Sequence, residues 1–377
     1  MNTAQRFGLA AAAPTVALLF AVITSAIVLL ASGSNPLEAF SEMINHARRL
    51  ETIIDILNRA TPLYLSGVAA AIGFKMNLFN IGVEGQYRLA ALIAAFVGAQ
   101  VALPGALHVG LILLTAMVVG AAYSGFAGVL KVTRGVNEVI STIMLNLIAI
   151  SGIIAALVRR WQAGGEVDAS DNSVGVGTEP IAESGIMPDL NGVVELFTRE
   201  IGSGKSLTGI FAVAIVVGIL YSVLLSRTRF GFDLRASGLN PFAAHASGVP
   251  PKRMVVSAMV LSGAVAGLVG MASLMTLGRF SPNFVGGLGF AGIATSLLGR
   301  NHPVGIAIAA LIFAFLDISS GILQVTGSAS REIVVIMQGI ILFAAVVAYE
   351  VVRRIREREE AKSAAAALVG NPEVASA

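Results

Sequence analysis

Long apolar segments separated by short polar ones recur along nearly the whole chain and constrain its fold more than any other feature. A helix of about 20 apolar residues crosses the hydrocarbon core of a bilayer, whereas a transmembrane barrel shows short alternating segments that do not occur in this sequence. With 56% hydrophobic and only 12% charged residues, the chain cannot form an ordinary soluble surface. We therefore predict an all-α, polytopic membrane protein of about ten transmembrane helices.

The predicted spans follow the uncharged runs. Pro104 and Gly105 form a turn that divides one long run into two helices. On the seventh span, Gly263, Gly267 and Gly270 form a small-residue face that predicts close helix packing. The eighth run is rich in glycine, so a broken or re-entrant segment is the alternative to a full span. The runs are Phe7–Ser32, Ile56–Phe74, Tyr87–Leu103, Ala106–Leu130, Val139–Val158, Ser206–Ser226, Met254–Gly278, Ser281–Leu298, Pro303–Leu323 and Ile333–Tyr349.

The placement of lysine and arginine predicts the orientation, because loops rich in them stay in the cytoplasm. The loop 227–253 and the tail 353–377 are both basic and are predicted to be cytoplasmic, with the tail following a membrane domain at 1–352. Both termini then lie in the cytoplasm, and the net acidic segment 159–207 lies outside. Three arginines near the outer end of the second span count against this orientation: Arg48, Arg49 and Arg59.

The sequence offers no convincing catalytic or cofactor site. The run GSGKS at 202–206 ends like a phosphate-binding loop, but Arg199 stands where the first glycine of that motif belongs, and a membrane span follows. The four histidines lie singly without paired ligand spacing, so we expect them to be structural and expect no metal. We expect no bound cofactor, and nothing in the sequence indicates a nucleic-acid partner.

The basic loop 227–253 contains a short helix with clearly marked ends. Asn240 is suited to cap its N-terminus, Pro241 to the first helical position, and Gly248 to a left-handed residue at its end. So short a helix is not stable alone in water and must lie on the chain's own membrane helices, on lipid or on a partner protein. Its small apolar face, built around Phe242, anchors weakly in lipid, which favours a protein partner.

A second polar feature is the stretch GFKMNLFNIGVEGQYRLAAL at 73–92, where Asn80 is placed to cap a helix with Glu84 in its first turn. A charged group inside a membrane costs about 2.5–3.5 kcal/mol, so intramembrane polar residues normally face protein or a watery path. The candidates for the path or its gate are Asn77, Asn80, Glu84, Gln86, Asn137, Glu138, Asn146 and Asp317.

Several of these candidates have a purely structural alternative. Asn137 and Glu138 are also placed to cap and charge-match a helix N-terminus. Asn146 is too far into its span to cap it, which leaves path lining or an interhelical hydrogen bond. Asp317 fits a protonated packing acid, an ion-pair partner or a path residue, and the sequence does not choose among them.

Four stretches carry a family resemblance. The loop segment GLNPFAAHASGV resembles the cytoplasmic coupling loop of ABC importer permeases of the branched-chain amino acid, sugar and nucleoside family. FKMNLFNIGVEGQ, GVNEVISTIMLNLIA and GFAGIATSLLGRNHPVG, in that order, are similar to its nucleoside branch. The resemblance implies a type II ABC importer permease fold for 1–352. It also implies a coupling role for a set of loop residues: Gly238, Asn240, Pro241, Phe242, Ala243, Ala244 and Gly248.

The resemblance further implies a translocation subunit in a bacterial inner membrane without a catalytic site of its own. An ABC ATP-binding subunit uses the ATP, a second and different permease completes the path, and an extracytoplasmic solute-binding lipoprotein delivers the solute. The amide and hydroxyl side chains suit a nucleoside but equally a neutral sugar. An ion-coupled secondary carrier and a membrane enzyme remain as alternatives; Asp317 supports the first, and the lack of a catalytic cluster disfavours the second.

Overall fold

The computed structural model describes residues 22–161, 177–195 and 205–326, together with Leu19 and scattered positions from 330 to 354. The chain divides into two compact units: Met1–Arg48 with Ser319–Ala377 forms unit 1, and Arg49–Ile318 forms unit 2. Apart from Arg354, the predicted tail lies outside the described residues, as do parts of the predicted outer segment.

Unit 1 contains two consecutive helices in its described N-terminal part. A helix at Val22–Ala31 is followed, after a bend of 116°, by α2 (Pro36–Ala47). Asn35 caps α2 by accepting a hydrogen bond of 3.1 Å from the Leu37 N–H. The buried residues of α2 are spaced four positions apart, as in an amphipathic helix. Its sequence therefore contains no continuous apolar run, and it is not among the predicted spans.

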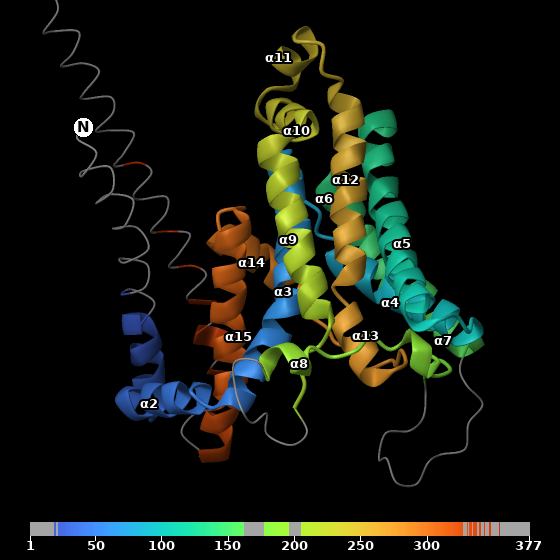
Figure 1. The fold of residues 1–377 in the computed structure, drawn as a ribbon. Helices are drawn as coiled ribbons and strands as arrows, with labels where there is room; N and C mark the ends of the chain where they lie inside the picture. Colours follow the sequence, from blue (N-terminus) through green and yellow to red (C-terminus); the bar gives the residue numbers. More distant parts are fainter. Residues whose placement is uncertain are drawn as a thin grey trace, which may run out of the picture. The chain divides into compact units, whose positions relative to one another are not determined.

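Unit 2 is a bundle of helices, and three of them, α5, α13 and α14, end at a glycine. Gly135 and Gly278 end α5 and α13 in the left-handed conformation, with φ of +69° and +64°. The helices of unit 2, drawn in Figure 1, are α3 (Leu50–Lys75), α4 (Val83–Gln100), α5 (Gly105–Arg134), α6 (Glu138–Leu147), the π-helix η1 (Ile148–Ile154), α7 (Ala155–Trp161), the 3-10 turn η2 (Glu183–Gly185), α8 (Asn191–Val194), α9 (Ile210–Arg227), α10 (Arg229–Leu239), α11 (Pro241–Ala246), α12 (Pro251–Leu268), α13 (Met271–Leu277), α14 (Leu288–Leu298) and α15 (Pro303–Thr326), the last of which runs on into unit 1.

Five helical segments of the described chain are long and apolar enough to cross a membrane, or six if the bent pair in unit 1 counts as one span. The count of ten stays a prediction. The helices α3 and α4 have 26 and 18 residues and are long enough, but they are less apolar because they carry polar and charged residues among their small ones. The predicted eighth span is correct only in its second half. Its helix α14 has 11 residues, which at 1.5 Å each is about half of a bilayer core.

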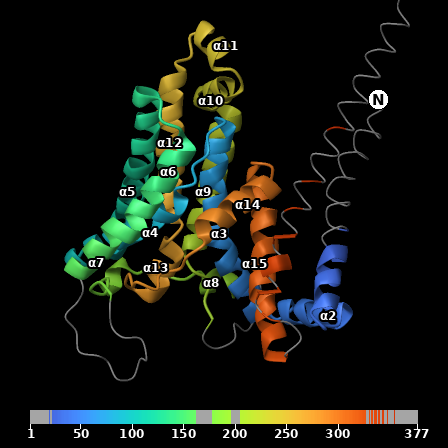
Figure 2. The ribbon, with the colours of Figure 1, turned by 180° about the vertical axis from the view of Figure 1, so that it is seen from behind.

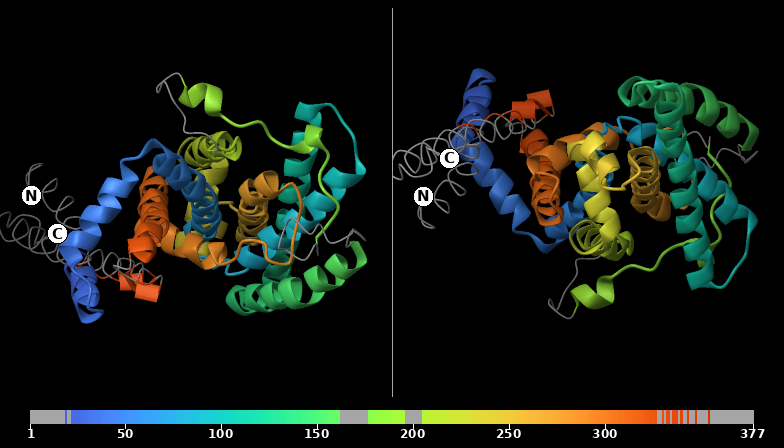
Figure 3. Two further views of the ribbon diagram at one scale, coloured as in Figure 1. Left: turned by 90° about the horizontal axis from the view of Figure 1, so that it is seen from below. Right: turned by 90° about the horizontal axis from the view of Figure 1, so that it is seen from above.

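The core of unit 2 is built around α3, which contacts α9, α12 and α14 (Figure 3). Beside it, α5 and α12 are packed at backbone contact. A Cβ atom added to Gly263 would lie 2.2 Å from the Gly120 carbonyl oxygen, and one added to Gly267 would lie 2.0 Å from the Ala116 carbonyl oxygen. The predicted small-residue face on the seventh span is therefore confirmed as a packing face.

The two ends of unit 2 differ in structure. At one end, α10 lies level with the ends of α5 and α12, and α11 lies beyond them (Figures 1 and 2). At the other, the described residues 177–190 run across the helix ends, where the Ile181 N–H donates to Gly278 O at 2.7 Å. Buried His108 fastens this segment, with its ring nitrogens 2.9 Å from Ser184 Oγ and 3.0 Å from Gly98 O, so its predicted structural role is confirmed.

Candidate functional site

The polar stretch 73–92 forms the break between α3 and α4. Helix α3 ends at Lys75, and Asn77 takes a left-handed conformation with φ of +57° that turns the chain back. The Leu78 N–H then donates to Gly73 O at 2.9 Å. A Cβ atom on Gly73 would lie 3.0 Å from the Leu78 carbonyl oxygen, which accounts for glycine at this position. The break is therefore a compact turn.

Asn80 and Gln86 form a reciprocal amide pair inside the protein. Asn80 Nδ2 donates to Gln86 Oε1 at 2.9 Å, and Gln86 Nε2 donates to Asn80 Oδ1 at 2.8 Å. Asn80 also reaches Ser262 Oγ at 2.9 Å, and Ser262 donates to Ala69 O on α3 at 2.7 Å. We call Asn80, Gln86 and Ser262 the amide cluster. Each of the three is at most 2% exposed, so the cluster joins α3, α4 and α12 without contact with solvent.

The predicted capping role of Asn80 is wrong. The N-cap position of α4 is Gly82, which makes no side-chain capping bond, and Asn80 lies two residues earlier, where its Oδ1 accepts from the Gly82 N–H at 3.2 Å. The second partner of Asn80 Oδ1 is the Gln86 side chain, and not a backbone N–H of the first turn of α4. The prediction failed because a buried partner across the turn outcompetes the local cap.

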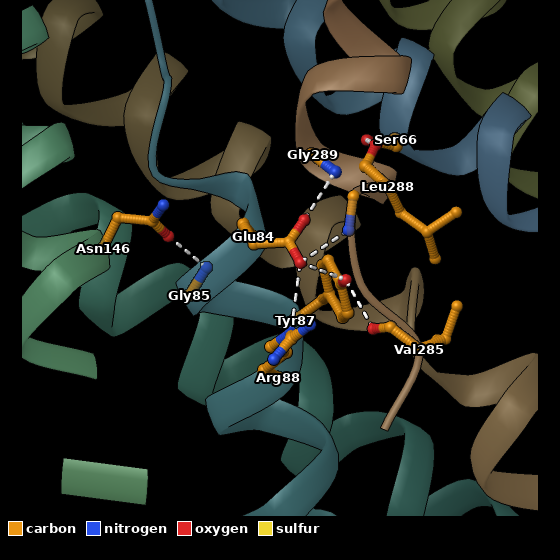
Figure 4. A network of polar contacts seen from close by, with 10 residues as sticks. Ser66, Glu84, Gly85, Tyr87, Arg88, Asn146, Val285, Leu288 and Gly289 are labelled. Carbon is orange, nitrogen blue, oxygen red and sulfur yellow. Dashed lines mark hydrogen bonds and ion pairs between the residues drawn. The ribbon is translucent and has the colours of Figure 1, made fainter. Parts of the chain in front are cut away.

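Glu84 connects α4 to the start of α14 (Figure 4). Its carboxylate, on a residue only 7% exposed, accepts from the Gly287 N–H at 2.8 Å and the Gly289 N–H at 2.9 Å. Arg88 Nε donates to the same carboxylate at 3.1 Å. The side chain therefore satisfies amide groups that a helix N-terminus leaves unpaired, and Arg88 balances its charge.

The segment before α14 is held by two further side chains that the sequence analysis did not single out. Ser66 on α3 donates to Leu288 O at 2.8 Å. The Tyr87 hydroxyl lies 2.8 Å from Glu84 Oε1 and 2.7 Å from Val285 O, and its single proton serves one of the two acceptors at a time. In the amino-acid sequence alone, nothing distinguishes these hydroxyl groups from those of packing residues. The half-span is thus fixed by polar contacts on both sides (Figure 4).

The structural alternatives hold at the start of α6. Asn137 caps it, accepting from the Val139 N–H at 2.8 Å. Glu138 is buried and pairs with Lys131 Nζ at 2.5 Å. Ser141 and Thr142 return their hydroxyls to the Glu138 carbonyl, as residues inside helices commonly do. These groups hold the turn between α5 and α6.

Asn146 makes an interhelical hydrogen bond, since its Oδ1 accepts from the Gly85 N–H at the start of α4 (Figure 4). A Cβ on Gly85 would lie 2.9 Å from the Ala149 Cβ, so glycine is what permits the two helices to meet. The π-helix η1 begins two residues after Asn146. Single π-helical turns inside α-helices are frequent at functional sites, and this one adjoins the contact between α4 and α6.

Asp317 is an ion-pair partner. Its Oδ2 lies 2.5 Å from Nε of Arg59 on α3, and both side chains are partly exposed. Arg59 is ten residues before Ala69, the level of the amide cluster, which corresponds to about 15 Å along the helix. Asp317 therefore does not join the other candidates, and the charge of Arg59, which counted against the predicted orientation, is compensated.

The predicted ends of the short helix in the loop 227–253 are confirmed. Asn240 Oδ1 accepts from the N–H groups of Phe242 and Ala243, both at 3.0 Å, Pro241 opens α11, and Gly248 has φ of +82°. Ala244 is buried, whereas the Phe242 side chain faces outward, at 86% exposed. The helix therefore presents an aromatic side chain to its surroundings.

Helix α10 was not predicted from the sequence. This helix links the loop 227–253 to the polar break between α3 and α4. A Cβ on Gly238 of α10 would lie 2.7 Å from Lys75 O and 2.8 Å from the Met76 Cα, so α10 touches the end of α3 backbone to backbone. Burial, and then the positive charge of Arg235, lower the pKa of the Lys75 ammonium group. Helix α10 is therefore in direct contact with the residues that precede Asn77.

A bundle of long apolar helices around a buried polar cluster is the arrangement of a membrane transport protein. A family model described as branched-chain amino acid transport system / permease component matches residues 52–346, and the chain belongs to this family. The resemblance drawn from its motifs is confirmed. Membership implies, in general terms, an ATP-binding subunit and a solute-binding protein as partners, and it makes the chain a multi-pass membrane transport component.

Individual relatives are similar over most of the chain. A nucleoside ABC transporter permease protein of Lactococcus lactis subsp. cremoris is 31% identical, covering 88% of this chain and 90% of its own. A guanosine ABC transporter permease protein of Bacillus subtilis is 31% identical, covering 88% and 92%. A glucose ABC transporter permease protein of Haloferax volcanii is 30% identical, covering 89% and 86%. No solved structure matches significantly.

Proposed function

We propose that the chain is the transmembrane subunit of an ATP-driven importer that takes up nucleosides. The observation that carries this proposal is the link from the capped, outward-facing helix α11 through α10 to the polar break, where Gly238 of α10 touches the end of α3. Phe242 at the tip of α11 is 86% exposed, and Leu239 beside it is 88% exposed. Exposed apolar side chains on a short fixed helix suit a protein socket, here the ATP-binding subunit. The residues proposed to couple are Gly238, Asn240, Pro241, Phe242, Ala243, Ala244 and Gly248.

The mechanism follows from the chain of contacts. Closure of the ATP-binding subunits pushes α11 and α10, and Gly238 passes the movement to Lys75 and Met76 at the end of α3. The turn at Asn77 is the point at which α3 and α4 can change their relative direction. We infer that this movement changes the amide cluster and the Glu84 contact with α14, so that the polar groups, buried in this state, become part of an open path.

The substrate assignment rests on the chemistry of the candidate path residues. A nucleoside presents hydroxyl groups on its ribose and donors and acceptors on its base, which amides and hydroxyls bind without a fixed charge. Asn80, Gln86 and Asn146 supply such groups, and two of the relatives named above are nucleoside and guanosine permeases. The glucose permease among them supports the runner-up, a simple sugar, since the same amides also bind sugar hydroxyls.

We propose the predicted orientation, with α10 and α11 in the cytoplasm. Basic residues gather at that end of unit 2: Lys75, Lys131, Arg134, Arg227, Arg229, Arg235, Lys252 and Arg253. Residues 177–190 then face outward, where they offer a fixed surface to a solute-binding lipoprotein. We further propose that the chain forms a heterodimer with a second, different permease in a bacterial inner membrane. Residues 1–352 then form its membrane domain, and residues 353–377 form its cytoplasmic tail.

The proposal is tested by transport in proteoliposomes that contain the chain, its co-purified ATP-binding subunit and second permease, and the solute-binding protein. We expect uptake of radiolabelled nucleoside that requires ATP and is abolished by an excess of unlabelled nucleosides but not by glucose. Inhibition by glucose alone moves the assignment to the sugar. Uptake by the chain alone, driven by an ion gradient without ATP, refutes the importer.

The coupling role has its own test. Phe242→Ala should abolish ATP-driven uptake and lower the ATPase activity stimulated by the binding protein, while the complex remains monodisperse, because so exposed a side chain contributes little to folding. Leu220→Ala, another exposed large apolar residue but on α9, is the matched control and should transport normally. Equal uptake by both variants would remove α11 from the coupling mechanism.

A further inference from the structure

An apolar groove of about 440 Å³ runs along the surface of unit 2, apart from the amide cluster. It lies between α3, α9 and the first half of α15, and each helix contributes one face at helical spacing: Leu57, Ala60, Thr61 and Tyr64; Phe211, Ala214, Ile215, Gly218, Ile219 and Ser222; Pro303, Val304, Ala307, Ala310 and Leu311. We propose that this groove binds one acyl chain of an anionic phospholipid.

The polarity of the lining excludes a hydrophilic solute. The groove offers three hydroxyl groups and otherwise only aliphatic and aromatic carbon. One of the three, Thr61 Oγ1, donates to Leu57 O of its own helix at 2.8 Å and is therefore already used. A nucleoside or sugar in this groove would lose most of its hydrogen bonds with water, whereas a hydrocarbon chain loses none.

The dimensions fit a single acyl chain. The lining of α9 extends from Phe211 to Ser222, a distance of about 16 Å at the helical rise. One leaflet contributes about half of a hydrocarbon core of about 30 Å, so the groove is as long as one leaflet is thick. Gly218 opens the space, since a Cβ there would lie 2.9 Å from the Tyr64 ring carbon Cζ. Ile219 and Val304 line the groove and are themselves exposed, which leaves it open along the side of unit 2.

The charges at one end of the groove select the sign of the headgroup. Helix α9 ends at Arg227, and α15 begins at Pro303, just after Arg300. The Tyr221 hydroxyl donates to Asn301 O at 2.9 Å, so Arg300 lies beside α9 at the end of the groove marked by Ser222, and Arg227 follows on α9 about 9 Å beyond Tyr221. Both arginines are exposed to the surroundings of unit 2. A phosphate with a further negative charge, as in phosphatidylglycerol, is attracted there more strongly than a zwitterionic headgroup.

The test uses the full-length chain in nanodiscs that contain a phosphatidylglycerol with a photoactivatable diazirine in the middle of one acyl chain. Phosphatidylcholine with the same chain is the comparison, and mass spectrometry locates the labelled peptides. We expect labelling in the three lining segments to exceed, several-fold, that on the exposed face of α6 around Ile140 and Leu147. Phosphatidylglycerol should label the groove several-fold more than phosphatidylcholine.

Two kinds of variant make the test decisive. Ala307→Phe fills the groove and should remove the excess labelling, and Ile219→Trp, at an exposed lining position that demands no repacking, should do the same. Ala156→Phe places the same ring on the exposed surface of α7 and should leave the labelling unchanged. Arg227→Gln with Arg300→Gln should abolish the preference for phosphatidylglycerol only.

Three results overturn the proposal. Uniform labelling around the protein surface indicates ordinary solvation by lipid. Labelling of the groove that does not depend on the headgroup or on the two arginines refutes the proposed selectivity for an anionic phospholipid. A groove protected from both lipids is occupied by protein, either another part of this chain or a second permease.

Discussion

Replacing Glu84 by glutamine, which keeps its shape and removes its charge, tests the contact between α4 and α14 most directly. The carboxylate accepts hydrogen bonds on both oxygens, from two backbone N–H groups and from Arg88. In the glutamine, the amide NH₂ must face either the Gly289 N–H or the donors around Oε1. One buried N–H thus loses its acceptor at a cost of about 1–3 kcal/mol, and Arg88 loses the charge that balanced its own. Because the Arg88 side chain is 21% exposed, water compensates part of the second loss, and we expect a total of about 2–4 kcal/mol.

The assay is thermal unfolding of the purified protein in detergent, followed by size-exclusion chromatography of a fluorescent fusion. Glu138→Gln is the matched control, because that residue is equally buried but its carboxylate has one partner, the partly exposed Lys131. Glu84→Gln should lower the apparent melting temperature clearly more than Glu138→Gln. Adding Arg88→Met to Glu84→Gln should restore part of the loss, since it removes the unpaired charge. Equal effects of the two glutamine variants would refute the assignment of Glu84 as the link to α14.

Gly267→Ala should destabilise the protein strongly, because the added methyl group would lie 2.0 Å from a backbone oxygen of α5. Gly152→Ala, where the added methyl group has no atom within 4 Å, should be neutral or stabilising, and melting curves of the two variants measured in parallel compare them. Asp317→Asn should cost at most about 1 kcal/mol, because it and Arg59 are 28% and 30% exposed, and should leave ATP-driven uptake intact; loss of uptake with normal folding would return Asp317 to the path. Asn240→Ala should remove the two capping hydrogen bonds of α11 at a cost of about 1 kcal/mol. ATP-driven uptake should fall strongly while the melting temperature falls only slightly; a lower melting temperature with normal uptake would mean that the cap matters only for folding.

The sequence predicts well those features that depend on neighbours along the chain. Asn240, Pro241 and Gly248 mark the ends of α11 through backbone geometry that their own side chains determine, and the structure agrees. Pro104 falls in the turn between α4 and α5 for the same reason. Close packing on the seventh span was predictable because a face with only glycine at the contact positions has few other uses in a membrane.

The partners of buried polar groups were not predictable, because the packing of distant segments determines them. Glu84 binds amides more than 200 positions later in the chain, and Asn80 reaches Ser262. When only their neighbours along the chain are known, Asn80 is interpreted as a helix cap and Glu84 as a charge that interacts with the helix dipole. Asp317 illustrates the limit: an isolated acid in an apolar run is compatible with three roles, and only the position of Arg59 on another helix separates them.

The contacts also indicate which parts of unit 2 can move during transport. Helices α5 and α12 touch through their backbones at Gly120 and Gly263, where a small displacement produces a clash, so they are expected to move as one rigid body. The half-span α14 is different, since its N-terminus is held by hydrogen bonds from Ser66 and to Glu84, which can exchange partners at little cost in packing. With α10 pressing on the end of α3, movement should concentrate at the two breaks, the turn at Asn77 and the glycine-rich start of α14. Single cysteines introduced at these breaks into this cysteine-free chain should change their rate of labelling by a thiol reagent when ATP is added. Cysteines at Leu114 or Val118, on the exposed face of α5, should not.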